Sequence, residues 1–253
     1  QDKFSNNVLP LRVGNDVATI DRAMRVIEIL SSRREFTILN PFVVLLGKGE
    51  HQITSSWTDG NDTVHPTTLE ITRSNITFGG RGQGTTTISG GFGINEQENI
   101  TFKKMTVTNT GENGDGIRMT NAKVKLVDVA LKGRRNCALH IPDSTSETIV
   151  VATRCEFADS RYGAVVGGSL TSATFKNCVF RDNKYYGIVG RESTTTHFHG
   201  EATALHSNRY CGMSASRTAK ILIHLPSHHN TSYNNAGKDR HTDSGGTISN
   251  VED

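Results

Sequence analysis

The segment Ile100-Thr-Phe-Lys-Lys-Met-Thr-Val107 decides the fold, because copies of it return about every 24 residues along the chain. Apolar and polar side chains alternate in each copy, which is typical of strands with one buried face. Each copy leads through a polar turn to a small residue that opens a second apolar strand. The later copies begin at Lys123, Val150, Ala173 and Thr196, and the small residues are Gly116, Ala138, Gly163, Gly187 and Gly212.

A repeat this short cannot bury its apolar face alone, so successive copies must stack as rungs about 4.8 Å apart. Stacking predicts apolar columns that fill the interior. A β-sandwich would not need this register, and a left-handed β-helix has a shorter period. We therefore predict an all-β fold, a single-stranded right-handed parallel β-helix. The predicted columns are Val107, Leu131, Phe157, Phe180 and Leu205, and Met105, Val129, Cys155 and Cys178.

The sequence predicts one domain over residues 1–253 with a cap at each end of the repeats. Apolar residues at helical spacing between Ile20 and Leu30, preceded by Thr19 as N-cap, predict a capping α-helix over about 16–33. A cap there would cover the open strand edge. Rungs are expected over about 36–227, beginning with a strand over 36–46 that is broken at Pro41. Residues 228–253 lose the periodicity and are expected to form an irregular cap.

Composition excludes several classes of protein. Only 34% of the 253 residues are hydrophobic and 6% aromatic, with 25 glycines, which argues against a helical bundle. No apolar run is long enough for a membrane span. The net charge of +3 comes from scattered basic residues rather than a basic stripe, so nucleic acid is not expected as a partner. The four cysteines lack the spacing of zinc ligands, and no cofactor motif is present. Cys155 and Cys178 are expected to stack as free thiols, and a disulfide between them is the alternative.

Three segments resemble a known family. These are Val44-Leu-Leu-Gly-Lys-Gly-Glu-His-Gln-Ile53, Ile76-Thr-Phe-Gly-Gly-Arg-Gly with Thr87-Ile-Ser-Gly-Gly-Phe92, and the closing Gly245-Gly-Thr-Ile-Ser-Asn250. The chain is similar over about residues 14–250 to pectin-lyase-like right-handed β-helix proteins of marine algae, other protists and large algal DNA viruses. The resemblance implies the same fold. It implies little about activity, because the superfamily spans lyases, hydrolases, epimerases and inert scaffolds.

Candidate catalytic residues lie in the outward column of the second strand, which reads Arg118, His140, Val165, Val189 and Ser214. The column holds no carboxylate pair for glycoside hydrolysis. The Asp-Pro-His-Asp signature of alginate epimerases is also absent. Arg118 and His140, one rung apart, could serve a metal-free β-elimination, with Arg stabilising the enolate and His or Tyr acting as base. The alternative is that both are solvated surface residues, with Asp115 or Glu112 pairing with Arg118.

A carbohydrate-binding surface is predicted at one corner of three successive rungs. Tyrosines gather there, and basic residues form a rim that would suit an acidic polysaccharide. The alternative is simple packing at the corner. The tyrosines are Tyr162, Tyr185, Tyr186 and Tyr210, and the basic residues are Arg161, Lys184, Arg191 and Arg209.

Histidines and sequons add weaker expectations. His197 and His199 form an H-x-H pair that could hold a metal, but no third ligand is visible at sensible spacing, so no metal site is expected; His228 and His229 lie in the tail. Sequons occur at Asn61, Asn75, Asn99 and Asn230. Those at Asn75 and Asn99 stand one repeat apart and are expected to serve rung corners. Asn61 is the expected glycan acceptor in a secretory pathway.

These features lead to a ranked set of hypotheses. The first is a non-catalytic module that binds or presents acidic polysaccharide at a cell or virion surface, because its usual catalytic face lacks carboxylates. The second is a metal-independent polyuronate lyase using Arg118 and His140. The third is a structural or protein-interaction scaffold, for which the tyrosines would be the partner site.

Overall fold

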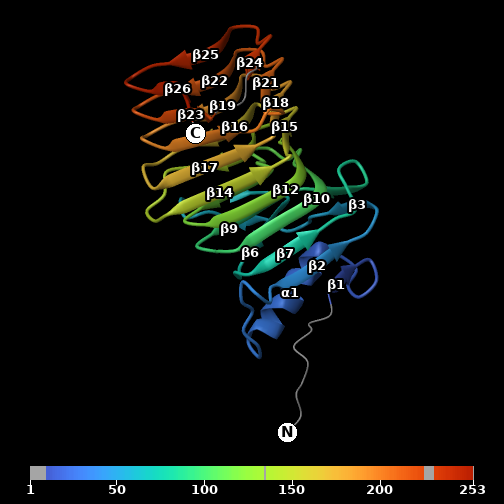
Figure 1. The fold of residues 1–253 in the computed structure, drawn as a ribbon. Coiled ribbons are helices and arrows are strands. Elements are labelled where there is room, and N and C mark those ends of the chain that lie inside the picture. Colours follow the sequence, from blue (N-terminus) through green and yellow to red (C-terminus); the bar gives the residue numbers. More distant parts are fainter. Residues whose placement is uncertain (1–9, 134, 225–230, 253) are drawn as a thin grey trace.

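The computed structural model describes residues 10–133, 135–224 and 231–252. It shows a parallel β-solenoid in which the chain coils upward from the N-terminal to the C-terminal end (Figure 1). Two long parallel sheets run along the coil, and we call them the first and the second sheet. The predicted β-helix is confirmed.

The first sheet contains the repeat segment from which the fold was predicted. Its main path is β1 (Leu11–Val13), β2 (Phe42–Leu46), β7 (Ile76–Gly79), β10 (Ile100–Thr108), β12 (Lys123–Lys132), β14 (Thr148–Thr153), β17 (Thr171–Lys176), β20 (Thr195–His199), β23 (Lys220–His224) and β26 (Thr247–Val251). Short strands beyond a bend extend it, namely β3 (Gly49–Gln52), β8 (Thr86–Ser89), β15 (Glu156–Ala158), β18 (Val179–Arg181), β21 (Ala204–His206) and β24 (Ser232–Tyr233).

The second sheet contains the strands that follow each polar turn. They are β6 (Thr68–Ile71), β9 (Gly91–Asn95), β11 (Ile117–Thr120), β13 (Cys137–Ile141), β16 (Tyr162–Val166), β19 (Tyr186–Gly190), β22 (Cys211–Ala215) and β25 (Lys238–Thr242). A small antiparallel hairpin, β4 (Trp57–Thr58) with β5 (Val64–His65), stands outside both sheets.

The predicted core columns are present in register. Leu131 pairs with Phe157, Phe157 with Phe180, and Phe180 with Leu205. The Phe157 and Phe180 rings stack at 4.6 Å between centroids, and both side chains are fully buried. All four cysteines are buried free thiols. Burial raises the pKa of the Cys178 thiol, with its neighbour Cys155 adding to the effect. A free thiol there behaves as a small apolar side chain.

Polar turns are held by an amide ladder inside the coil. The side chain of Asn183 donates to Asn208 at 2.9 Å, and Asn208 donates to Asn235 at 2.8 Å. Asn183 and Asn208 are fully buried. Each of these three amides also donates to a backbone carbonyl, so the bends of these three successive rungs are tied together. Asn75 and Asn99 do the same at another corner, bonded to one another at 2.9 Å, as the repeat predicted.

The N-terminal cap is close to its prediction. Helix α1 spans Ile20–Ser31, and the Thr19 hydroxyl accepts from the Arg22 N–H at 3.2 Å. Its apolar face joins the core at the first rung, where it covers the end of the coil (Figure 1). The predicted strand over 36–46 is wrong in its first half. Only 42–46 is a strand, because Thr37 and Asn40 close a turn before Pro41.

The expected irregular cap over 228–253 is wrong for residues 231–252. There β24, β25 and β26 add another rung, each pairing in parallel with the strand below. Backbone hydrogen bonds continue although the apolar alternation fades. Most side chains of this rung are exposed, so they need not be apolar. Ile248 alone of this rung packs partly buried against the core.

The core columns give the first prediction. Phe180→Ala should lower the free energy of unfolding by about 3–5 kcal/mol, because it leaves a cavity beneath Leu205 and beside Phe157. Urea unfolding followed by circular dichroism measures the loss. Leu170→Ala, at an exposed position, is the matched control and should change stability by less than about 0.5 kcal/mol. A loss below about 1 kcal/mol for Phe180→Ala would contradict the packing.

Candidate functional site

Arg118 and His140 lie side by side on the outer face of the second sheet, as their one-rung spacing predicted. They pair in register, and the Arg118 Nη1 atom is 2.7 Å from His140 Nδ1. They are not solvated surface residues. The side chain of Arg118 is 13% exposed and that of His140 is 23% exposed. The rest of the predicted column, Val165, Val189 and Ser214, is in register but buried.

Two buried carboxylates reach this pair from outside the column. Asp115, in the turn before β11, places Oδ2 3.1 Å from His140 Nδ1 and 3.7 Å from Arg118 Nη1. Asp59, in the turn of the β4–β5 hairpin, places Oδ2 3.1 Å from Arg118 Nη2 and from His65 Nε2. Asp115 was foreseen as a partner of Arg118, whereas Glu112 binds Arg135 instead. Asp59 and His65 were missed. We call Asp59, His65, Asp115, Arg118 and His140 the polar cluster.

The hairpin reaches the sheet because one rung has no side chain there. A Cβ atom on Gly93 would stand 2.3 Å from the Trp57 ring, so only glycine lets the indole lie against β9. Trp57 also stacks on His65 at 5.2 Å between ring centroids. This packing holds Asp59 in place above Arg118. No repeat position predicts this packing, since the hairpin lies outside the repeat.

Hydrogen bonding inside the polar cluster leaves one proton position undecided. A guanidinium can only donate, so Arg118 at 2.7 Å requires His140 Nδ1 to accept and its proton to sit on Nε2. Asp115 can only accept when ionised, so its contact at 3.1 Å requires a proton on Nδ1. Both contacts cannot be made at once. Each tautomer of His140 therefore satisfies one of the two contacts at Nδ1.

The cluster borders a cleft of about 500 Å³ between the hairpin and the second sheet. Its lining is mostly polar, and its charged residues are four carboxylates and Arg118. The acidic residues that line it are Asp59, Glu70, Glu96 and Asp143. This charge does not favour a polyanion inside the cleft.

The tyrosines gather at one corner as predicted. Tyr162 and Tyr186 pair across neighbouring rungs with parallel rings 5.8 Å apart. Tyr185 lies against Tyr162 at 5.5 Å, and Tyr210 meets Tyr186 edge-on at 5.2 Å. Tyr210 is 51% exposed and the others are partly exposed, so simple burial does not account for them. We call these four residues the tyrosine corner.

Basic side chains surround the tyrosine corner. The Arg161 guanidinium lies 5.2 Å from the Tyr185 ring centre, and the Lys184 ammonium lies 5.7 Å from the same ring. Burial raises the pKa of Tyr186, and the charge of Arg191 opposes that shift. Arg209 and Lys184 line one hollow of about 550 Å³. Its acidic neighbours Asp159 and Asp182 are engaged by Lys132 and Arg181, respectively.

The polar cluster and the tyrosine corner lie on neighbouring strands of the second sheet. Cys137 pairs in register with Tyr162, and it lies beside Asp115 and His140, with its sulfur within 4.8 Å of their ligand atoms. The charge of Arg191 acts on both Cys137 and Tyr186. The outer face of the second sheet thus carries acid–base groups at β11 and β13 and aromatic and basic groups at β16 and β19.

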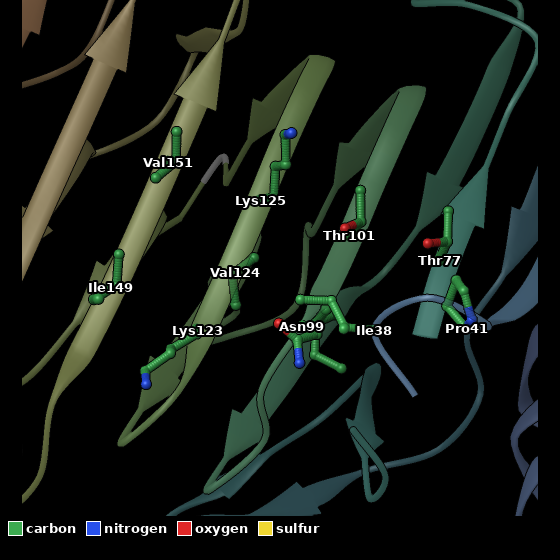
Figure 2. Close-up of a pocket in the computed structure, with 11 residues that line it drawn as sticks. Ile38, Pro41, Thr77, Asn99, Thr101, Lys123, Val124, Lys125, Ile149 and Val151 are labelled. Carbon is green, nitrogen blue, oxygen red and sulfur yellow. The ribbon is translucent and has the colours of Figure 1, made fainter. Parts of the chain in front are cut away.

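A second hollow, of about 420 Å³, lies on the outer face of the first sheet (Figure 2). The loop with Ile38 and Pro41 closes one side of it, and Lys123 and Lys125 project from β12. Lys123 is paired with Glu98 and Glu147. The residues that line this hollow include no histidine and no carboxylate, so it offers little for acid–base chemistry.

The family described as right-handed β-helix region matches residues 115–251, more than half of the chain. The chain belongs to this right-handed β-helix family, and the predicted handedness is confirmed. No curated protein matches the sequence. No helix in the described part of the chain is long and apolar enough to cross a membrane.

Three solved structures are similar at low identity. A pectin methylesterase mutant in complex with a hexasaccharide is 12% identical, covering 86% of this chain and 80% of its own, with a TM-score of 0.48. A protein of Geobacillus virus E2 is 13% identical, covering 74% of this chain and 47% of its own, with a TM-score of 0.41. The A-module of a mannuronan C-5 epimerase from Azotobacter vinelandii is 15% identical, covering 86% of this chain and 74% of its own, with a TM-score of 0.37. At these values the similarity carries no functional information.

The polar cluster predicts a pH-dependent stability. Burial alone would raise the pKa of Asp59, but hydrogen bonds from His65, Asn61 and Thr63 and the charge of Arg118 together lower it. A lowered pKa in the folded state stabilises the fold above the unfolded value of about 3.9 and is lost as pH falls through the folded value. Asp59→Asn should cost about 1–3 kcal/mol at pH 7, and the difference should shrink below about pH 4. Urea unfolding at several pH values measures it, and a difference independent of pH would contradict the pairing.

Proposed function

We propose that this protein binds an acidic polysaccharide at the tyrosine corner of the second sheet. The observation that carries the proposal is the set of cations at the tyrosine corner. Among described residues, Arg161, Lys184, Arg191 and Arg209 make no ion pair with a carboxylate. Positive side chains without a protein counter-charge, set beside partly exposed aromatic rings, suit a ligand that carries carboxylates or sulfates on a sugar backbone.

The spacing of the corner supports a chain-like ligand. The rungs repeat about every 4.8 Å, and an extended pyranose unit is of similar length. A polyanionic glycan lying along the coil can therefore present one anionic group to each rung. Tyr162 and Tyr186 stack on each other, so the glycan would meet their exposed edges and hydroxyl groups rather than both ring faces.

Binding measurements test this function. Calorimetry with polygalacturonate or alginate should show binding that weakens as salt rises, and dextran should not bind. Arg161→Ala with Lys184→Ala should weaken binding at least about tenfold, because two charge-assisted contacts are lost. Lys103→Ala removes an exposed cation from the first sheet and is the matched control. Equal binding by the double variant and the control would refute the proposal, and a complete lack of glycan binding would favour the scaffold hypothesis.

A metal-independent polyuronate lyase is the second candidate. The observation that favours it is the His140 Nδ1 atom held between Arg118 and Asp115. In such an elimination a base removes the C5 proton, the C4–oxygen bond breaks, and the leaving oxygen takes a proton. Arg118 would stabilise the developing enolate. Two carboxylates already balance the charge of Arg118, and the adjoining cleft is acidic. The geometry therefore supports binding better than lysis.

The lyase candidate has a direct assay. Ultraviolet absorbance of an unsaturated uronate should rise with wild-type protein and polygalacturonate, alginate or glycosaminoglycan if elimination occurs. His140→Ala should then lose at least about a hundredfold in rate, since general acid–base catalysis contributes that much. Tyr210→Ala, away from the polar cluster, should keep its rate constant per bound chain. Constant absorbance with wild-type protein would exclude the lyase candidate and leave glycan binding as the only function of the two.

We also propose display outside the cell or on a virion, in keeping with a polysaccharide ligand. Asn61 is exposed in the hairpin turn and open to glycosylation, whereas Asn75 and Asn99 use their amides within the corner. Asn230 lies outside the described residues, as do His228 and His229. Kinship with algal and viral β-helix proteins in particular stays a prediction. A mass shift at Asn61 after glycosidase treatment of native protein would support a secretory route, and an unchanged mass would count against it.

A further inference from the structure

Three histidines meet on the outer face of the first sheet, far along the coil from the polar cluster. His197 and His199 stand two residues apart on β20 and so share a face, and His224 is on β23, the neighbouring strand. The His199 and His224 rings stack at 4.0 Å, and His197 lies 5.2 Å from His224. One ligand nitrogen from each of the three lies within 4.8 Å of the others. We call this group the histidine cluster.

The sequence prediction that no third ligand accompanies the H-x-H pair is therefore wrong. His224 follows His199 by 25 residues, which is one repeat of the coil. Strands β20 and β23 pair in parallel, and Phe198 lies opposite Ile223. The next residues of the two strands, His199 and His224, therefore lie side by side. The parallel register thus turns two distant positions into neighbours.

The chemistry of these ligands selects one class of ion. Neutral imidazoles suit Zn²⁺, Cu²⁺ and Ni²⁺, whereas Ca²⁺ and Mg²⁺ require oxygen ligands. No carboxylate belongs to the cluster as the described residues define it. Three histidines with a fourth position left for water or an anion form the ligand set of zinc in carbonic anhydrase.

The surroundings of the cluster are partly buried, since all three side chains are half-buried. Burial lowers the pKa of His197, and the nearby His224 lowers it further. Thr174 and Lys176 lie on the rung below, opposite His197 and His199. A cation at Lys176 favours an anion or hydroxide as the fourth ligand.

We propose that His197, His199 and His224 form a binding site for one late transition-metal ion, with Zn²⁺ or Cu²⁺ as the fitting species. The ion replaces the contact of 2.9 Å that now joins His197 Nδ1 to His224 Nε2. Small turns of the rings, which project from the surface of the sheet, bring three nitrogen lone pairs onto one centre. This site is independent of the proposed glycan surface on the second sheet.

Metal titration of the whole protein tests the site. Competition with a chromophoric zinc chelator at pH 7.5 should give one Zn²⁺ per chain, and Ca²⁺ should not compete. Affinity should fall at acid pH, because protons compete with the metal for the imidazole nitrogens. Zn²⁺ should also raise the melting temperature, because it binds the folded chain. His197→Gln and His224→Gln should each weaken Zn²⁺ binding at least about tenfold.

Matched variants decide between this site and other histidines. His206→Gln changes a half-buried histidine on β21 and should leave Zn²⁺ affinity unchanged. Circular dichroism without metal checks that each variant folds. With Cu²⁺, the nitrogen hyperfine pattern in electron paramagnetic resonance should lose one imidazole in each cluster variant. Equal affinity in His197→Gln, His224→Gln and His206→Gln would overturn the proposal, as would binding that is lost only with His228→Gln and His229→Gln.

Discussion

Parallel hydrogen bonding between successive rungs is the constraint on which the rest of this structure depends. It places each residue directly against its equivalent one repeat later, as Phe157 against Phe180 and Asn183 against Asn208. A column can therefore hold only side chains that pack or hydrogen-bond favourably with the equivalent side chains of the adjacent rungs. Apolar columns fill the interior, and amides suit the buried turns because each can donate to one neighbour and accept from the other. Unpaired, such buried amides would each cost free energy.

The same constraint made most of the fold readable from the sequence. Columns repeat at a fixed spacing, so Val107, Leu131 and Phe157 can be aligned from the sequence alone, and the structure pairs them as expected. A rung that does not bury its side chains carries no such signal. The last rung keeps its backbone pairing while its residues face solvent, so residues 231–252 carry little apolar signal. A backbone ladder can continue without the pattern that reveals it.

The candidate site contains residues that belong to the repeat and residues that do not, and only the former could be predicted. Arg118 and His140 could be paired from the sequence because both belong to the repeat. Asp59 and His65 could not, because they come from a hairpin inserted between rungs, and the absence of a side chain at Gly93 does not say which segment fills the space. The histidine cluster was a different kind of miss. Its signal was present in the sequence, because His224 follows His199 by one repeat and parallel pairing of β20 with β23 makes the two residues neighbours.

A solenoid of this kind separates its chemistry by face rather than by domain. The polar cluster and the tyrosine corner lie on the second sheet, and the histidine cluster lies on the first sheet, with the core columns between them. Because each outward position is flanked by fixed neighbours, one substitution can add a ligand beside two existing ones without disturbing the core. Changes in outward columns therefore alter binding at little cost in stability, whereas changes in inward columns such as Phe180 are felt throughout the stack. Sites can arise and be lost on this fold while the coil itself is kept.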